Sequence, residues 1–211
     1  MIPVAAIVEG HGEVKALPVL LRRMGPWLSP QCQFSALHPI RVHRDRFLNN
    51  EGEFRHTLRL AANKSGDNGW ILVLLDADDD CPAKLGPQTL ERAKAIVPHR
   101  RLSVVLANRE FEAWFLAAAY SLDGKRGFSC SEEPVFDPDT LRNAKGWIGE
   151  HMSSDRKYRE ITDQPAFAAM FDLEAAHTRS RSFRKLCDEF VKCGSSQKTF
   201  QGHNGTDSRT I

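Results

Sequence analysis

The 211-residue sequence has no apolar run near a length of about 18 residues, the minimum needed to cross a bilayer. It also shows no signal peptide, because its apolar N-terminus reaches a carboxylate at Glu9. Its five cysteines are odd in number and scattered, and no two form a C-x-x-C pair, so neither a disulfide framework nor a zinc site is indicated. These absences predict a cytoplasmic protein with free thiols and no membrane association.

A strong charge imbalance is also missing, since 29 basic and 27 acidic residues leave a formal net charge of +2. Composition alone therefore does not indicate nucleic-acid binding, and any anion-binding surface must be local. The remaining composition, with 41% hydrophobic and 27% charged residues, is ordinary for a globular chain. Length and composition together predict one main domain.

Short apolar runs alternate with segments of helical periodicity over the first 120 residues. The runs predict strands at residues 3–8, 33–43, 70–75 and 102–107. The segments that follow them predict helices that begin at residue 13 and that cover residues 53–63, 89–96 and 110–120. This alternation predicts an α/β fold in which a parallel sheet is flanked by helices.

No strand pattern follows residue 121. Helical patterns at residues 141–152, 164–170 and 180–193 predict a helical C-terminal extension. The last residues are rich in Gly, Ser, Thr and Asn, which predicts a mobile tail. The expected organisation is a main domain at residues 1–122, a helical extension at 123–193 and a tail at 194–211.

Carboxylates follow two of the predicted strands. Glu9 closes the first strand, and Asp76, Asp78 and Asp80 follow the most apolar one. Ligands bind outside the carboxyl ends of parallel strands, so these side chains would converge if the two strands are neighbours. Crowded carboxylates raise one another's pKa unless a cation is present, and oxygen ligands suit Mg²⁺ or Mn²⁺. The pattern therefore predicts a site for a divalent cation.

Glu13 lies four residues after Glu9, across a glycine turn into a helix, and can face the same point. Gly10, His11 and Gly12 form that turn and would leave amide groups near a helix N-terminus, where phosphate is favoured. A dinucleotide-binding loop is disfavoured, because Lys15 replaces the third glycine of its pattern. Two other interpretations stay open: Glu13 as an ordinary first-turn glutamate, and Glu9 as a solvated loop residue.

Glu9 and Glu13 stand in the motif Val8-Glu9-Gly10-x-x-Glu13, and the aspartates stand in Leu74-Leu75-Asp76-Ala77-Asp78. These two motifs resemble the Toprim domain, the metal-binding fold shared by topoisomerases, bacterial primases and the overcoming-lysogenization-defect nucleases. Three further stretches resemble the domain-of-unknown-function 4276 family, Toprim-like proteins often encoded beside an ATPase. The stretches are Ala107-Asn108-Arg109-Glu110-Phe111-Glu112-Ala113-Trp114-Phe115, Thr162-Asp163-Gln164-Pro165-Ala166 and Arg179-Ser180-Arg181-Ser182-Phe183-Arg184-Lys185-Leu186.

The resemblance implies roles for individual residues. Glu9, Glu13, Asp76 and Asp78 would be the catalytic residues and the ligands of Mg²⁺ or Mn²⁺. Three more acids are candidate metal ligands, with the choice between the last two left open: Asp80, Glu110 and Glu112.

A nuclease also needs groups that hold a polyanion. Six residues are candidates for substrate binding: Gly10, His11, Gly12, Lys84, Arg181 and Lys185. Arg181 and Lys185 are four residues apart and share one helix face, which can contact phosphate or simply be solvated.

These observations lead to the expectation of a metal-dependent nuclease that hydrolyses phosphodiester bonds in DNA or RNA. The resemblance implies an effector of a defence-type system with an ATPase partner. The alternative is a non-catalytic Toprim-like subunit that docks on such an ATPase. Aromatic residues after Ser121, among them Trp147, Tyr158 and Phe171, predict that the C-terminal segment mediates docking or self-association.

Overall fold

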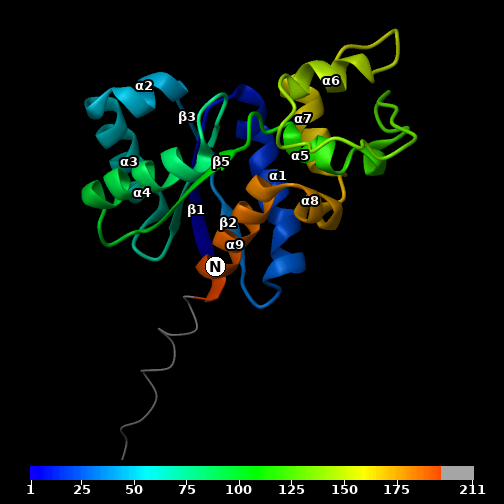
Figure 1. Cartoon of the computed structure of the whole chain (residues 1–211). Coiled ribbons are helices and arrows are strands. Elements are labelled where there is room, and N and C mark those ends of the chain that lie inside the picture. Colours follow the sequence, from blue (N-terminus) through cyan, green and yellow to red (C-terminus); the bar gives the residue numbers. More distant parts are fainter. Residues whose placement is uncertain (196–211) are drawn as a thin grey trace, which may run out of the picture.

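A computed structural model of the chain describes residues 1–195 (Figure 1). Its centre is a five-stranded sheet in which every paired strand is parallel, in the order β2-β1-β4-β5, with β3 also paired to β1. The strands are β1 (Ile2–Val8), β2 (Phe34–Ala36), β3 (Ile40–Arg41), β4 (Trp70–Asp76) and β5 (Arg101–Ala107). The α/β prediction with a parallel sheet is confirmed.

The predicted strand at residues 33–43 is divided into β2 and β3, which pair with opposite ends of β1. Pro39 lies between them. Because proline has no amide hydrogen, it cannot donate to a ladder, and the pairing stops and resumes around it.

Helices cover both faces of the sheet. Helices α3 (Glu51–Ser65) and α4 (Pro82–Ile96) pack on one face, where the alternate residues Ile71, Val73 and Leu75 of β4 point. Helix α1 (His11–Leu28) and helix α9 (Arg181–Ser195) pack on the other face (Figure 1). The run of β4 is buried on both sides, as expected of a central parallel strand.

Shorter helices complete the chain. They are α2 (Arg44–Asn49), α5 (Ala113–Ala117), the 3₁₀ helix η1 (Ala119–Leu122), α6 (Ala144–Glu150), α7 (Glu160–Ala168) and α8 (Leu173–Arg179). Neither α2 nor α8 was predicted from the sequence, and the predicted helix at residues 110–120 is a shorter α5 followed by η1. Gly194 and Ser195, predicted to begin the tail, belong to α9, and residues 196–211 lie outside the described part of the chain.

The C-terminal helices belong to the same apolar core as α1 and the face of the sheet that α1 covers. Helix α7 packs on α1, and Phe167, Phe171 and Phe183 are buried against Trp114 and Phe115. This packing includes Phe171, whose ring is fully buried and is not available to a partner. The expected division at residue 122 therefore runs through a single core.

Among residues 1–195, no helix combines the length and the apolar character that a bilayer crossing would require.

Candidate active site

The carboxyl ends of β1 and β4 meet at one edge of the sheet, and the strand order changes direction between them. Ligands of open α/β sheets bind at such a point. A cavity of about 380 Å³ lies there, and the turn after β1, the two loops after β4 and β5, and helices α6 and α7 all contribute to it. Its lining consists of Glu9, Gly10, His11, Glu13, Arg41, His43, Asp76, Asp78, Glu110, Lys145, Glu160 and Ile161.

The turn after β1 supplies two glutamates. The Glu13 carboxylate, in the first turn of α1, accepts the amide N–H of Gly10, which closes the turn. Glu9 is partly buried, and its Oε2 atom is buried without a hydrogen-bond partner. Burial raises the pKa of both carboxyls, and for Glu9 the neighbouring charges of Asp78 and Glu13 raise it further. The turn therefore places in the lining of the cavity a carboxylate that has one buried, unpartnered oxygen.

The loop after β4 supplies the aspartates. Asp76 ends the strand, and its Oδ1 accepts the amide N–H of Phe111 at 2.8 Å. Burial raises the pKa of Asp76 well above its usual value, and the charges of Glu13 and Glu112 add to the effect. Asp78 has a φ of 50°, the left-handed region that aspartate tolerates better than most residues. Both aspartates line the cavity with the two glutamates.

Asp80 is placed differently from its neighbours. It forms an ion pair with Arg44 of α2, whose guanidinium also donates to the carbonyl oxygens of Asp76 and Ala77. Arg44 Nε lies 3.7 Å from Asp78 Oδ2. Asp80 does not line the cavity. Its ion pair with Arg44 instead helps to hold the loop that carries the aspartates.

The structure separates the two glutamates after β5. Glu110 lines the cavity, and its Oε2 accepts the amide N–H of Lys145 at 3.0 Å. Glu112 is fully buried behind the cavity, where its Oε1 accepts the Tyr158 hydroxyl at 2.9 Å and the Gln164 amide at 3.2 Å. Burial raises the pKa of Glu112 to about 8. Of the two candidates, Glu110 is the one exposed to the cavity.

Lys145 lies among these carboxylates, and no motif in the sequence points to it. Its Nζ lies 3.3 Å from Glu160 Oε1. Burial alone would lower the pKa of Lys145, but the carboxylates of Glu112, Asp76 and Glu160 raise it, so the lysine stays charged. Lys145 and Glu160 come from α6 and α7, far from the sheet in sequence.

Arg44 could have been found, because it follows β3, whose carboxyl end lies at the same edge of the sheet as the aspartates. For Lys145 the sequence offers no such signal: it lies in a segment whose place depends on packing alone.

The donor set suits a hard divalent cation. The four predicted ligands carry only oxygen donors, and Glu9 Oε2 is orphaned in a buried position. Among residues 1–195, however, no three or more His, Cys, Asp or Glu side chains are arranged as a group that could hold a metal ion. Binding a metal would therefore require side chains of this site to move.

The predicted substrate-binding residues do not gather at one place. Gly10 and His11 line the acidic cavity, whereas Gly12 is buried against Gln164. Lys84 is exposed on α4 and does not line the cavity. Arg181 and Lys185 line a different pocket, between α4 and α9.

A second surface joins the acidic cavity. This open groove of about 900 Å³ shares Lys145, Glu160 and Ile161 with the cavity, and it adds Lys157 and Arg159. Glu160, the only acid in its lining, is paired with Lys145. The groove thus carries a positive surface directly to the carboxylates.

Comparison with known proteins gave one match. A family with the description "Domain of unknown function (DUF4276)" matches residues 8–190. No curated protein and no solved structure matches the chain.

Proposed function

The chain belongs to the DUF4276 family, and from this premise we propose that it is a Mg²⁺- or Mn²⁺-dependent phosphodiester hydrolase that acts on DNA or RNA. The likeness to Toprim nucleases, read from the two acidic motifs, is part of the same proposal. The observation that carries it is the gathering of Glu9, Glu13, Asp76 and Asp78 around one cavity at the sheet edge.

The crowding of these carboxylates favours the binding of a cation among them. Three of them have a raised pKa because they are buried near one another. Lys145 and Arg41 offset only part of this charge, since six carboxylates line the cavity when Glu110 and Glu160 are included. A divalent cation held by Glu9, Glu13, Asp76 and Asp78 would polarise a phosphate and lower the pKa of a bound water.

The residues of the chain would position the reacting groups. Lys145 remains protonated and can hold a phosphate oxygen by a charge-assisted hydrogen bond beside the carboxylates. Arg44 donates to the carbonyl oxygen of Asp76 and the Phe111 amide donates to its Oδ1, and together these bonds hold the aspartate loop at the cavity. Glu112 and Tyr158 form a buried support behind that loop.

The polyanion would lie in the open groove that continues from the cavity. Lys157 and Arg159 face this groove, and both are exposed. Cations beside a catalytic site give sequence-independent, salt-dependent binding to a phosphate backbone. We assign substrate binding to this groove, and the pocket that contains Arg181 and Lys185 is left for a different ligand.

The test is a cleavage assay over plasmid DNA, single-stranded DNA and transfer RNA with Mg²⁺ or Mn²⁺. Asp76→Asn and Asp78→Asn should each abolish metal-dependent cleavage, while Asp188→Asn, a change at an exposed position on α9, should retain it. Because the family resemblance includes an ATPase partner, the assay is run with and without the ATPase encoded nearby. If wild type and the Asp76→Asn protein give the same products on every substrate, the proposal is refuted.

A binding subunit without hydrolysis is a second candidate, and one observation favours it. Lys145 already occupies the acidic centre, and the described residues contain no group arranged to hold a metal. Such a subunit would dock on the ATPase and bind metal or nucleotide in the cavity. Calorimetry with Mn²⁺ separates the two: binding that Asp76→Asn removes, without cleavage under any condition, supports the subunit.

A further inference from the structure

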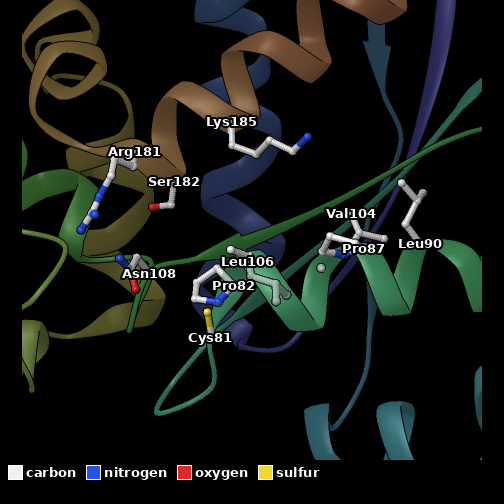
Figure 2. Close-up of a pocket in the computed structure, with 12 residues that line it drawn as sticks. Cys81, Pro82, Pro87, Leu90, Val104, Leu106, Asn108, Arg181, Ser182 and Lys185 are labelled. Carbon is white, nitrogen blue, oxygen red and sulfur yellow. The ribbon is translucent and has the colours of Figure 1, made fainter.

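A second pocket, of about 480 Å³, lies between α4 and α9 at the outer edge of β5 (Figure 2). Figure 2 shows Pro82, Pro87 and Leu90 of α4 on one side, and Arg181, Ser182 and Lys185 of α9 on the other. β5 is the last strand of the sheet, so Val104 and Leu106 form the floor beside an edge with no further strand among residues 1–195. The pocket is distinct from the acidic cavity, because the two share no lining residue.

The chemistry of the pocket is apolar with a cationic rim. Its walls are largely aliphatic and proline side chains, and its charged lining residues are Arg181 and Lys185. No Asp or Glu lines it. Pockets that bind small molecules have this composition, with apolar walls and a few polar groups that fix orientation. We propose that this pocket binds a small anion with an apolar body, whose charged group lies against Arg181 and Lys185.

Both cations can take part in such binding. Lys185 forms an ion pair with Glu189, one turn along α9, and Lys192 forms an ion pair with the same carboxylate. Ser103 donates to Glu189 as well, so the carboxylate keeps partners when Lys185 turns to a ligand. Arg181 is mostly exposed and lies 3.4 Å from both Asp137 and Asp139, distances at the long end for such pairs. The Asp137 pair is exposed and contributes little to folding stability. The Asp139 carboxylate is buried, but it also accepts the Ser180 hydroxyl at 2.8 Å and the backbone N–H of Arg181 at 2.7 Å, so it keeps partners when the guanidinium turns to a ligand.

The size of the pocket limits the ligand class. A volume of about 480 Å³ suits a single small molecule and is too small for a folded partner. Helices α4 and α9 both contact β5 and bound the pocket on two sides. A small amphipathic anion fits between them.

The test uses octanoate and its neutral analogue 1-octanol as probes, with the full chain in metal-free buffer. Isothermal titration calorimetry should show saturable 1:1 binding of octanoate, at least tenfold tighter than that of octanol. Lys185→Gln should weaken octanoate binding at least threefold and leave octanol unchanged. Lys94→Gln, which removes an exposed lysine of α4 outside the pocket, is the matched control.

A second variant fills the pocket without harming the fold. A Cβ at Gly86, which lines the pocket on α4, meets no atom within 4 Å, and leucine is a better helix former than glycine. Gly86→Leu should therefore remain folded and weaken both probes at least tenfold. Absence of saturable octanoate binding, equal affinity for octanol, or unchanged binding in Gly86→Leu would each overturn the proposal. None of these results bears on cleavage, which the acidic cavity alone is proposed to perform.

Discussion

The buried carboxyl of Glu112 should make the stability of the protein fall as the pH rises. Its pKa is about 8 in the folded protein, against an ordinary value of 4.5. Between these two pH values Glu112 loses its proton in the unfolded chain but keeps it in the folded protein. The unfolded state therefore binds fewer protons, and the free energy of unfolding falls as the pH rises. The penalty is absent below pH 4.5, grows through the interval and is complete above pH 8.

The size of the effect follows from the two pKa values. A gap of about 3.5 pH units at about 1.36 kcal/mol per unit amounts to about 5 kcal/mol over the whole interval. Between pH 5.5 and 7.5 the share is about 3 kcal/mol, which corresponds to roughly 6–12 °C in melting temperature for a chain of this length. Glu112→Gln removes the titration and keeps an oxygen for the hydroxyl of Tyr158 and the amide of Gln164.

Glu112→Gln also introduces a hydrogen-bond donor near two buried oxygens that have no partner. Glu112 Oε2 and Gln164 Oε1 are both buried without a partner, although the two side chains are joined by another hydrogen bond. A proton on Glu112, or the amide of an introduced glutamine, supplies the donor that this pair lacks. Burial is the main cause that favours the neutral form of Glu112, because the charge of Lys145 and the hydrogen bond from Tyr158 both lower its pKa.

The assay is urea unfolding followed by tryptophan fluorescence from pH 5.5 to 7.5, in buffer with a chelator. Relative to wild type, Glu112→Gln should gain about 3 kcal/mol in unfolding free energy between these limits. Glu150→Gln, at an exposed position on α6, should follow wild type throughout. If the curves of wild type and Glu112→Gln run parallel within about 1 kcal/mol, Glu112 is ionised in the folded protein and the reasoning fails.

Three further predictions concern the metal, the groove and the turn after β1. Mg²⁺ at a hundredfold excess over its Kd should stabilise wild type by about 2.7 kcal/mol and Glu9→Gln by clearly less, and equal thermal shifts would show that Glu9 is not a ligand. Lys157→Gln should make the slope of log K against log salt for single-stranded DNA less steep by about 0.7, whereas an unchanged slope would show that Lys157 does not contact phosphate. A Cβ at Gly12 would overlap Gln164, so Gly12→Ala should lose about 1–3 kcal/mol in urea unfolding. Gly25→Ala in the same helix, where a Cβ meets no atom within 4 Å, should instead gain up to about 1 kcal/mol, and equal stability of the two variants would contradict the overlap.

The sequence predicted those parts of the fold that depend on local pattern. The apolar run before Asp76 could only be a central strand, and its carboxyl end had to carry the aspartates to the edge where Glu9 ends β1. The apolar pattern at residues 33–43 predicts one strand, because periodicity does not resolve the two short strands on either side of Pro39.

The remaining parts of the site depend on contacts between distant segments. Lys145 faces the carboxylates only because α6 packs on α5 while α7 packs on α1, and no spacing in the sequence encodes these contacts. Glu110 and Glu112 are two residues apart in an irregular stretch before α5, so which one turns inward is decided by Tyr158 and Gln164. The assignment of Arg181 and Lys185 to substrate binding stays a prediction, and α9 places both at a pocket that shares no lining residue with the acidic cavity.

The packing of α7 on α1 has a consequence for the order of events during synthesis. The carboxylates of β1, β4 and β5 are translated by residue 110, but Glu160 and the helix that carries it follow 50 residues later. At about 5–20 residues per second, the ribosome needs roughly 3–10 s to add that stretch. During this interval the nascent chain has its acids but lacks the groove that would hold a polyanion beside them. With the function proposed above, the chain would become able to hold a polyanion beside its acids only once the last third of the chain has folded back onto the first helix.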